Sequence, residues 1–220
     1  MIIQKPYIIL EGNVEYTLGH IQNNLIIYDF DKILVYLNAK GKLLFGAGFK
    51  LFDEDSEIVF RLCNYMIRDE ANCKKLDMDV RKGVLLTGPV GCGKTSLMKL
   101  LRHIVPHQKP YKMMPSRNIV FGFNHIGYKT IEDFGNGQCF CFDDLGVEPM
   151  GRHYGKDCNV MGEVLLSRYD LFLGYSIKTH ATTNLNAQEL EERYGIRVRS
   201  RMRELFNLVA FDDGSKDKRT

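Results

Sequence analysis

The chain has 220 residues, of which 45% are hydrophobic and 26% charged, and its formal net charge is +3. These values are ordinary for a soluble globular protein, and the length allows one sizeable α/β domain with a small appendage. No apolar run approaches the roughly 18 residues that a membrane helix needs, and the first residues lack the features of a signal peptide. We therefore expect a cytoplasmic protein without membrane contact, and the net charge alone does not indicate a nucleic-acid partner.

Residues 1–52 contain short β-prone runs, which cover residues 7–10, 14–18, 25–28 and 33–37. Turn-forming residues separate these runs, including those at 38–42, as is typical between short strands. We interpret the segment as an irregular or small β-rich extension, with a Gly-rich linker turn at residues 45–49.

An amphipathic helix is predicted next. Residues 53–57 are mostly acidic, which suits a first helical turn. Apolar residues then recur at helical spacing, at positions 58, 59, 62, 63, 66 and 67. Residues 74–82 are polar and are predicted to connect this helix to the strand at residues 83–87.

A Gly-rich turn lies between a predicted strand at residues 83–87 and a predicted helix at residues 96–105. Its sequence, Gly-Pro-Val-Gly-Cys-Gly-Lys-Thr, matches GxxxxGK[ST], the loop that cradles phosphates with backbone N–H groups at a helix N-terminus. Lys94 supplies a cation to the outer phosphates, and the hydroxyl of Thr95 can bind Mg²⁺. The predicted nucleotide-binding residues are Gly88, Pro89, Val90, Gly91, Cys92, Gly93, Lys94, Thr95 and Ser96.

The rest of the chain alternates between strands and helices. Predicted strands cover residues 111–114, 139–144, 178–183 and 208–211. Predicted helices cover residues 118–126, 128–134, 160–172 and 187–206, the last broken at Gly195, and residues 151–159 are predicted to be a loop. This alternation indicates a mainly parallel sheet with helices on both faces.

The six cysteines contain no CxxC pair, so a zinc site is not expected. Cys139 and Cys141 alternate on a predicted buried strand, where thiols act as small hydrophobic groups. Free thiols agree with a reducing compartment.

Two acidic residues follow the apolar strand that begins at Cys139. Asp143 is predicted to hold Mg²⁺ through a water molecule, and Asp144 to orient or polarise an attacking water. Glu148 is an alternative base, and an ordinary acidic turn is the structural alternative. Asn184 follows the next strand. Ligands of open parallel sheets bind outside the carboxyl ends of the strands, so Asn184 is predicted to lie beside the γ-phosphate and the water. The structural alternative is an asparagine that caps a helix or a turn.

Four motifs occur in series: the Gly-rich loop, Phe-Asp-Asp-Leu-Gly-Val-Glu, Thr-His-Ala-Thr-Thr-Asn-Leu and Tyr-Gly-Ile-Arg-Val-Arg-Ser-Arg-Met. Together they resemble AAA+ ATPases of the DnaC/IstB type, the helicase loaders and transposition helper ATPases, over about residues 54–213. The resemblance implies a P-loop AAA+ core at residues 53–213, an extension at 1–52 and a polar tail at 214–220. The chain departs from the AAA+ pattern in one respect: only about 19 residues follow Arg201, so the helical lid common in AAA+ proteins is not expected, which suits the loader branch.

The resemblance also implies a function: ATP and Mg²⁺ as cofactors, a homo-oligomer with hydrolysis at subunit interfaces, and loading or remodelling of a replicative helicase on DNA. An ATP-switched adaptor for a transposase is the alternative. A small-molecule kinase is disfavoured, because such kinases use lid arginines rather than the Thr-Thr-Asn and Ser-Arg-Met elements.

Further roles are implied by the resemblance alone. Arg201 matches the arginine finger that reaches a neighbouring subunit's site, with Arg199 as the fallback. Lys218 or Arg219 matches a basic C-terminal sensor. The segment that carries Arg117, Tyr128 and Lys129 lines the inside of the assembly in the loader branch, so it is expected to meet single-stranded DNA; solvated surface charges are the alternative for Arg117 and Lys129.

Overall fold

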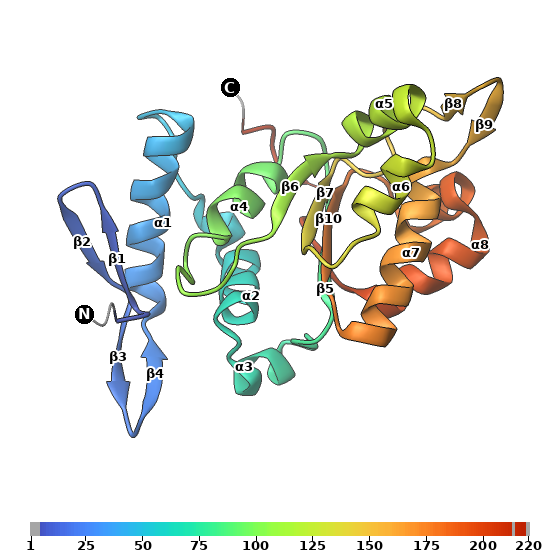
Figure 1. The fold of residues 1–220 in the computed structure, drawn as a ribbon. Coiled ribbons are helices and arrows are strands. Elements are labelled where there is room, and N and C mark those ends of the chain that lie inside the picture. The colour runs from blue at the N-terminus through green and yellow to red at the C-terminus, as the bar shows by residue number, and fades with distance from the viewer. Residues whose placement is uncertain (1–4, 213, 219–220) are drawn as a thin grey trace. The chain divides into compact units, whose positions relative to one another are not determined.

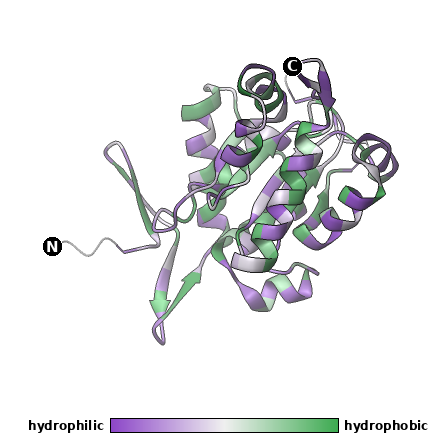
Figure 2. Ribbon diagram, turned by 45° about the vertical axis from the view of Figure 1, so that its right-hand side comes forward, coloured by the Kyte–Doolittle hydropathy of each residue, from purple (hydrophilic) through white to green (hydrophobic). Residues whose placement is uncertain are grey.

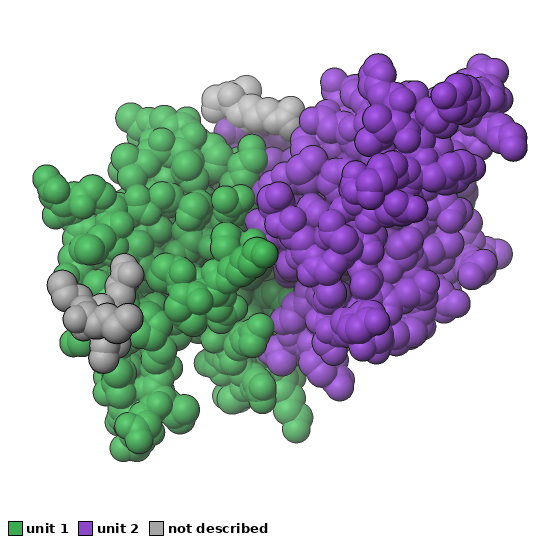
Figure 3. Space-filling model, in the orientation of Figure 1, with its two compact units in different colours: residues 1–78, 96–110 green, residues 79–95, 111–220 purple. Residues whose placement is uncertain are grey.

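The computed structural model describes residues 5–212 and 214–218. Within these ranges the chain forms two compact units, coloured separately in Figure 3. We call the part made of residues 1–78 and 96–110 the N-terminal unit, and the part made of residues 79–95 and 111–220 the sheet unit. Each unit is described by itself.

The N-terminal unit contains two antiparallel hairpins and a long helix. The hairpins are β1 (Ile8–Glu11) with β2 (Val14–Thr17), and β3 (Gly19–Gln22) with β4 (Leu25–Tyr28). Helix α1 (Phe30–Phe45) follows, so the strand expected at residues 33–37 and the break at 38–42 are wrong. The carboxylate of Asp29 accepts from two N–H groups of the first turn, and the apolar residues at 33, 36 and 37 are buried at helical spacing. This cap and spacing outweigh the local β propensity.

The predicted acidic helix start is a 3₁₀ turn, η1 (Asp53–Asp55), and α2 (Ser56–Ile67) continues from it as expected. A short helix, α3 (Glu70–Lys75), was missed, although Asp69 caps it by accepting from the Asn72 N–H at 2.9 Å. Helix α4 (Lys94–Leu101) begins directly at the Gly-rich loop.

Five strands among the described residues form the parallel sheet of the sheet unit, in the order β11-β5-β10-β7-β6 (Figure 1). They are β5 (Gly83–Thr87), β6 (Lys112–Pro115), β7 (Phe140–Asp143), β10 (Thr179–Thr183) and β11 (Phe206–Ala210). Thr87, the last residue of β5, pairs with Thr183 of β10 and Ala210 of β11. The polar residues that follow these strands therefore share one edge of the sheet.

Four helices flank this sheet: α5 (Ser116–Ile126), α6 (Lys129–Phe134), α7 (Val160–Tyr175) and α8 (Ala187–Leu205). Helix α8 is broken at Gly195, which has a non-helical backbone, as expected from the sequence. The loop expected at residues 151–159 is instead a hairpin, β8 (Gly151–His153) with β9 (Lys156–Cys158). Its turn places Tyr154 and Gly155 at positive φ, the geometry of a tight two-residue hairpin, but its strands lack an alternating apolar pattern.

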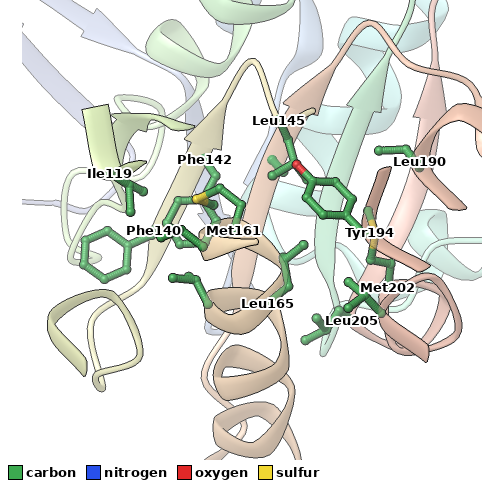
Figure 4. Packing of buried hydrophobic residues seen from close by; sticks show 14 of the residues in the cluster. Ile119, Phe140, Phe142, Leu145, Met161, Leu165, Leu190, Tyr194, Met202 and Leu205 are labelled. Carbon is green, nitrogen blue, oxygen red and sulfur yellow. The ribbon is translucent and has the colours of Figure 1, made fainter. Parts of the chain in front are cut away.

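The core of the sheet unit lies between the sheet and helices α5, α7 and α8. Figure 4 shows Met161 and Leu165 of α7 beside Phe140 and Phe142 of β7, with side chains of α8 next to them. In Figure 2 hydrophobic and hydrophilic residues alternate around the helices, as expected for helices with one buried face. None of the described helices is long and apolar enough to cross a membrane.

Candidate nucleotide-binding site

The Gly-rich loop leaves β5 through a backbone that favours glycine. Gly88, Gly91 and Gly93 have φ of 148°, 84° and 101°. A Cβ at Gly88 would also lie 2.6 Å from the Cβ of Phe211, so this position has no room for a side chain. The loop thus curls closely over the end of β5, as phosphate binding through backbone N–H groups requires.

Lys94 is the buried cation of this loop. Its Nζ donates to the carbonyl oxygens of Gly88 and Pro89, both at 2.7 Å, and lies 3.6 Å from the sulfur of Cys92. The ammonium group is therefore held against the backbone of its own loop. A bound phosphate would offer it an anionic partner there, which forms stronger hydrogen bonds than neutral carbonyl groups do.

Asp143 and Thr95 meet as the sequence predicted for a magnesium site. The Asp143 Oδ1 accepts from the Thr95 hydroxyl at 2.8 Å and from the Thr182 hydroxyl at 2.7 Å. A carboxylate and a threonine hydroxyl are the hard oxygen donors that suit Mg²⁺, which keeps several of its waters. These residues fit the ion: Thr95 would be a direct ligand, and Asp143 would act through water.

Asp144 follows β7 with a left-handed backbone, φ 53°, and its N–H donates to the Thr182 hydroxyl at 3.0 Å. Thr182 therefore bridges the two aspartates, a role that sequence reasoning missed. Ser116 was missed too: its hydroxyl donates to the Asp143 carbonyl at 3.0 Å. The run Thr-Thr-Asn at the end of a strand was the available signal for Thr182, whereas nothing in the sequence pointed to Ser116.

Glu148 does not suit the role of an alternative base. Its carboxylate is buried and accepts from the Gly146 N–H at 2.8 Å and the Tyr194 hydroxyl at 2.5 Å. Arg193 lies 3.6 Å from the same carboxylate. Both oxygens are thus engaged within the protein, which corrects the expectation from sequence and leaves Asp144 as the candidate base.

Asn184 comes directly after β10, at the same sheet edge as the Gly-rich loop, because Thr183 pairs with Thr87. The Thr183 hydroxyl donates to the Leu145 carbonyl at 2.6 Å and accepts from the Leu185 N–H at 3.1 Å. These bonds fix the segment beside Asn184, in keeping with its predicted position near the γ-phosphate.

The two candidate finger arginines lie on the part of α8 that follows the break at Gly195. Helix α8 leads into Phe206, which pairs with Gly83, the first residue of β5, whereas the phosphate loop follows the last. The guanidinium of Arg201 lies 4.4 Å from the centre of the Tyr169 ring. Arg199 donates to the Ala187 carbonyl at 3.4 Å, and burial lowers the pKa of its guanidinium.

The C-terminal tail contacts the phosphate loop. The Lys218 N–H donates to the Gly91 carbonyl at 3.0 Å, and its Nζ donates to the Cys92 carbonyl at 3.1 Å. Arg219, the other residue considered as a basic sensor, lies outside the described residues.

The residues expected to meet DNA lie on and beside α5. Arg117 is exposed and lies over the Phe121 ring, and Tyr128 is 62% exposed. Lys129 is exposed but forms ion pairs with Glu132 at 3.4 Å and Asp133 at 3.1 Å, and these raise its pKa.

No family model matches the chain. A stretch of 46 residues is 48% identical to a putative ABC transporter ATP-binding protein of Methanosarcina mazei, covering 20% of this chain and 8% of that protein. A stretch of 136 residues is 28% identical to the ATP-dependent zinc metalloprotease FtsH of Rickettsia felis, covering 56% of this chain and 21% of that protein. The matches thus span small parts of these relatives.

Among solved structures, DnaI superposes with a TM-score of 0.52 at 19% identity, covering 74% of this chain and 88% of DnaI. The DnaC helicase loader superposes with a TM-score of 0.48 at 21% identity, covering 60% of this chain and 79% of DnaC. The likeness to DnaI and the parallel sheet confirm the predicted α/β fold, a mainly parallel sheet flanked by helices with a phosphate loop after β5.

Proposed function

We propose that the protein binds ATP with Mg²⁺ and hydrolyses it. The observation that carries this proposal is the meeting of Lys94, the Thr95–Asp143 pair and Asp144 at one edge of the sheet. Lys94 and the loop N–H groups bind the phosphates, and Mg²⁺ supplies charge neutralisation when bound. Asp144 accepts a proton from, or orients, the attacking water, and Asn184 positions that water.

Two substitutions test this assignment. Lys94→Ala should abolish nucleotide binding or turnover, because it removes the cation that faces the outer phosphates. Asp144→Asn should keep nucleotide binding and lower the hydrolysis rate by about 10²-fold or more, the usual contribution of a general base. Asp170→Asn, a change at an exposed carboxylate on α7, is the matched control. Unchanged turnover in both site variants would contradict the proposal.

We further propose that the protein acts in the cytoplasm as an ATP-dependent homo-oligomer that loads or remodels a replicative helicase. The four motifs in series and the DnaI-like fold support this. The alternative is an ATP-switched adaptor for a transposase. Identification of the proteins that purify with the chain separates the two: a helicase supports the first proposal and a transposase the second. Phosphoryl transfer to an added small acceptor would instead support a kinase.

Weak binding of single-stranded DNA with little sequence preference is part of this proposal. An arginine on the segment that begins at α5 would contact phosphates, and exposed aromatic rings stack on bases of any sequence. Tyr128 and Arg117 support this, and the β8–β9 hairpin adds Tyr154, which is 94% exposed, beside Arg152 and Lys156. The hairpin is joined to α5 by the Arg152 N–H, which donates to the Asn124 side chain at 2.7 Å.

Fluorescence anisotropy with a labelled oligonucleotide, with and without a non-hydrolysable ATP analogue, tests DNA binding across a salt series. Binding should weaken steeply with salt, because phosphate contacts release counterions. Arg117→Ala should flatten the salt dependence, and Lys129→Ala should do so less, since its charge is already paired. Tyr128→Ala and Tyr154→Ala should weaken binding, unlike the control Tyr175→Ala, which removes an exposed ring at the end of α7. Absence of binding with the analogue at low salt would remove DNA from the proposal.

A further inference from the structure

A buried polar cluster of Glu148, Arg193 and Tyr194 joins the loop after β7 to helix α8. The Glu148 carboxylate, with a side-chain exposure of 1%, accepts from the Gly146 N–H and from the Tyr194 hydroxyl. Arg193 adds its charge 3.6 Å away and also donates to the Glu148 carbonyl. Figure 4 shows the Tyr194 hydroxyl directed from α8 toward Leu145, which lies in this loop. Burial and the neighbouring Glu148 carboxylate raise the pKa of Tyr194, so its hydroxyl stays a donor.

Both ends of this cluster lie next to functional residues. On the loop side, Gly146 and Glu148 follow Asp144, the candidate base, within four residues. On the helix side, Tyr194 directly precedes Gly195, where α8 breaks. Residues 196–205, which we call the arginine helix, begin after that break and carry Arg199 and Arg201.

Filling this space with a carboxylate is energetically unfavourable compared with an apolar side chain. Burying a charge costs free energy that ion pairing and hydrogen bonds only partly offset, and an apolar side chain would pack the same gap at lower cost. Directional bonds, unlike apolar contacts, fix the position of both partners. The cluster therefore ties the segment after Asp144 to Tyr194, the residue directly before the break from which the arginine helix continues.

We propose that Glu148 and Tyr194 form a latch that couples the nucleotide site of a subunit to the orientation of its own arginine helix. When ATP and Mg²⁺ engage the edge that holds Asp143 and Asp144, movement of the loop is transmitted through the latch to the break at Gly195. Tyr194 and Glu148 are positioning residues, because they touch neither nucleotide nor the attacking water. The inference rests on the proposed ATP site.

The test compares Tyr194→Phe with Tyr36→Phe by hydrogen exchange of the full chain. Tyr36 in the N-terminal unit is a close counterpart: its hydroxyl donates to the Glu11 carboxylate at 3.1 Å, and Lys40 contacts the same carboxylate at 2.6 Å. Each change removes one hydroxyl from a tyrosine–glutamate–cation group and keeps the ring. Exchange is measured without nucleotide and with AMPPNP and Mg²⁺, together with the AMPPNP affinity and the thermal midpoint.

In the Tyr194 variant, amides of residues 145–148 and of the arginine helix should exchange about tenfold faster than in the Tyr36 variant, the size expected for one hydrogen bond to a charged group. AMPPNP should alter exchange of the arginine helix in the wild type and no longer do so in Tyr194→Phe, although its affinity stays within about twofold. An arginine helix that responds equally in both variants overturns the latch.

Failure of the ATP proposal would be visible separately, as absent AMPPNP binding to the wild type. In that case, hydrogen exchange measured without nucleotide decides whether residues 145–148 are coupled to the arginine helix. Faster exchange in both segments of Tyr194→Phe supports it, and faster exchange confined to residues 145–148 overturns it.

Discussion

At the scale of single residues, the candidate nucleotide site joins side chains from separate parts of the chain: Thr95 and Thr182 both donate to Asp143. Lys94, Thr95 and Asp143 were predicted from motif spacing, and the structure brings them to one edge of the sheet. The contacts that Thr182 and Glu148 make in the structure were not predicted. They depend on which strand lies beside β7 and which helix covers the loop after it, and neither is encoded in local spacing.

His180 is another buried polar residue whose surroundings could not be predicted from local sequence spacing. It lies fully inside the sheet on β10, where its Nδ1 accepts from the Val84 N–H at 3.2 Å and its ring packs against Tyr111. Burial, with the nearby charges of Lys178 and Arg168, lowers the pKa of His180 to about 3. The imidazole thus stays neutral in the folded protein at moderately acidic pH.

We predict an acid-dependent loss of stability from His180. Between its ordinary pKa near 6.5 and its folded pKa of about 3, the unfolded chain binds a proton that the folded chain does not. The contribution is complete above pH 6.5 and falls by about 1.4 kcal/mol per pH unit as the pH drops through this window. Urea unfolding at several pH values measures this loss. As the pH drops, the unfolding free energy of the wild type should fall by about 1.4 kcal/mol per pH unit more than that of His180→Asn, which keeps an acceptor but cannot gain the proton. Parallel pH profiles would contradict the prediction.

At the scale of elements, most segments of the sheet unit were predicted, whereas the long helix α1 and several short segments were not. Helices α2, α5 and α7 and the strands of the parallel sheet lie close to their expected positions. Helix α1, α3 and the β8–β9 hairpin were missed, because their capping or turn residues outweigh weak or misleading local propensities. The break in α8 was foreseen, since Gly195 interrupts an otherwise helical pattern.

The backbone conformation of Gly195 predicts that a side chain at this position destabilises the protein. Its φ of 83° and ψ of 160° fall in a region that is accessible essentially to glycine alone, and a Cβ there would meet nothing within 4 Å. Gly195→Ala should therefore cost about 1–3 kcal/mol of unfolding free energy through backbone strain alone.

Gly174→Ala is the matched control for this change. Gly174 lies within α7, and a Cβ there also meets nothing within 4 Å, but its φ is not positive. Alanine should stabilise the protein at this position by roughly 0.5–1 kcal/mol. Urea unfolding measures both changes, and a Gly195 variant as stable as the wild type would mean that the break does not depend on this conformation.

Within the sheet unit, the candidate nucleotide site and Arg201 lie toward opposite ends of the parallel strands. The phosphate loop follows β5, Asp143 is the last residue of β7 and Asp144 comes next, whereas Arg201 lies toward the first residues of β5 and β11. An arginine at that edge is badly placed for the site of its own sheet. A second copy, arranged head to tail, would present its arginine helix to the open nucleotide edge of the first, as heterologous contacts allow. This geometry supports the proposal that the finger acts between subunits.

We predict that Arg201→Ala keeps ATP binding and loses hydrolysis, because arginine fingers in other nucleotide hydrolases contribute about 10³–10⁵ in rate. The decisive measurement mixes Arg201→Ala with Asp144→Asn. In an equal mixture, about a quarter of the head-to-tail interfaces join an intact site to an intact arginine, so part of the ATPase activity should return. The same mixture with Arg199→Ala in place of Arg201→Ala shows which arginine serves as the finger. If crosslinking verifies co-assembly and every mixture stays inactive, neither arginine acts across the interface.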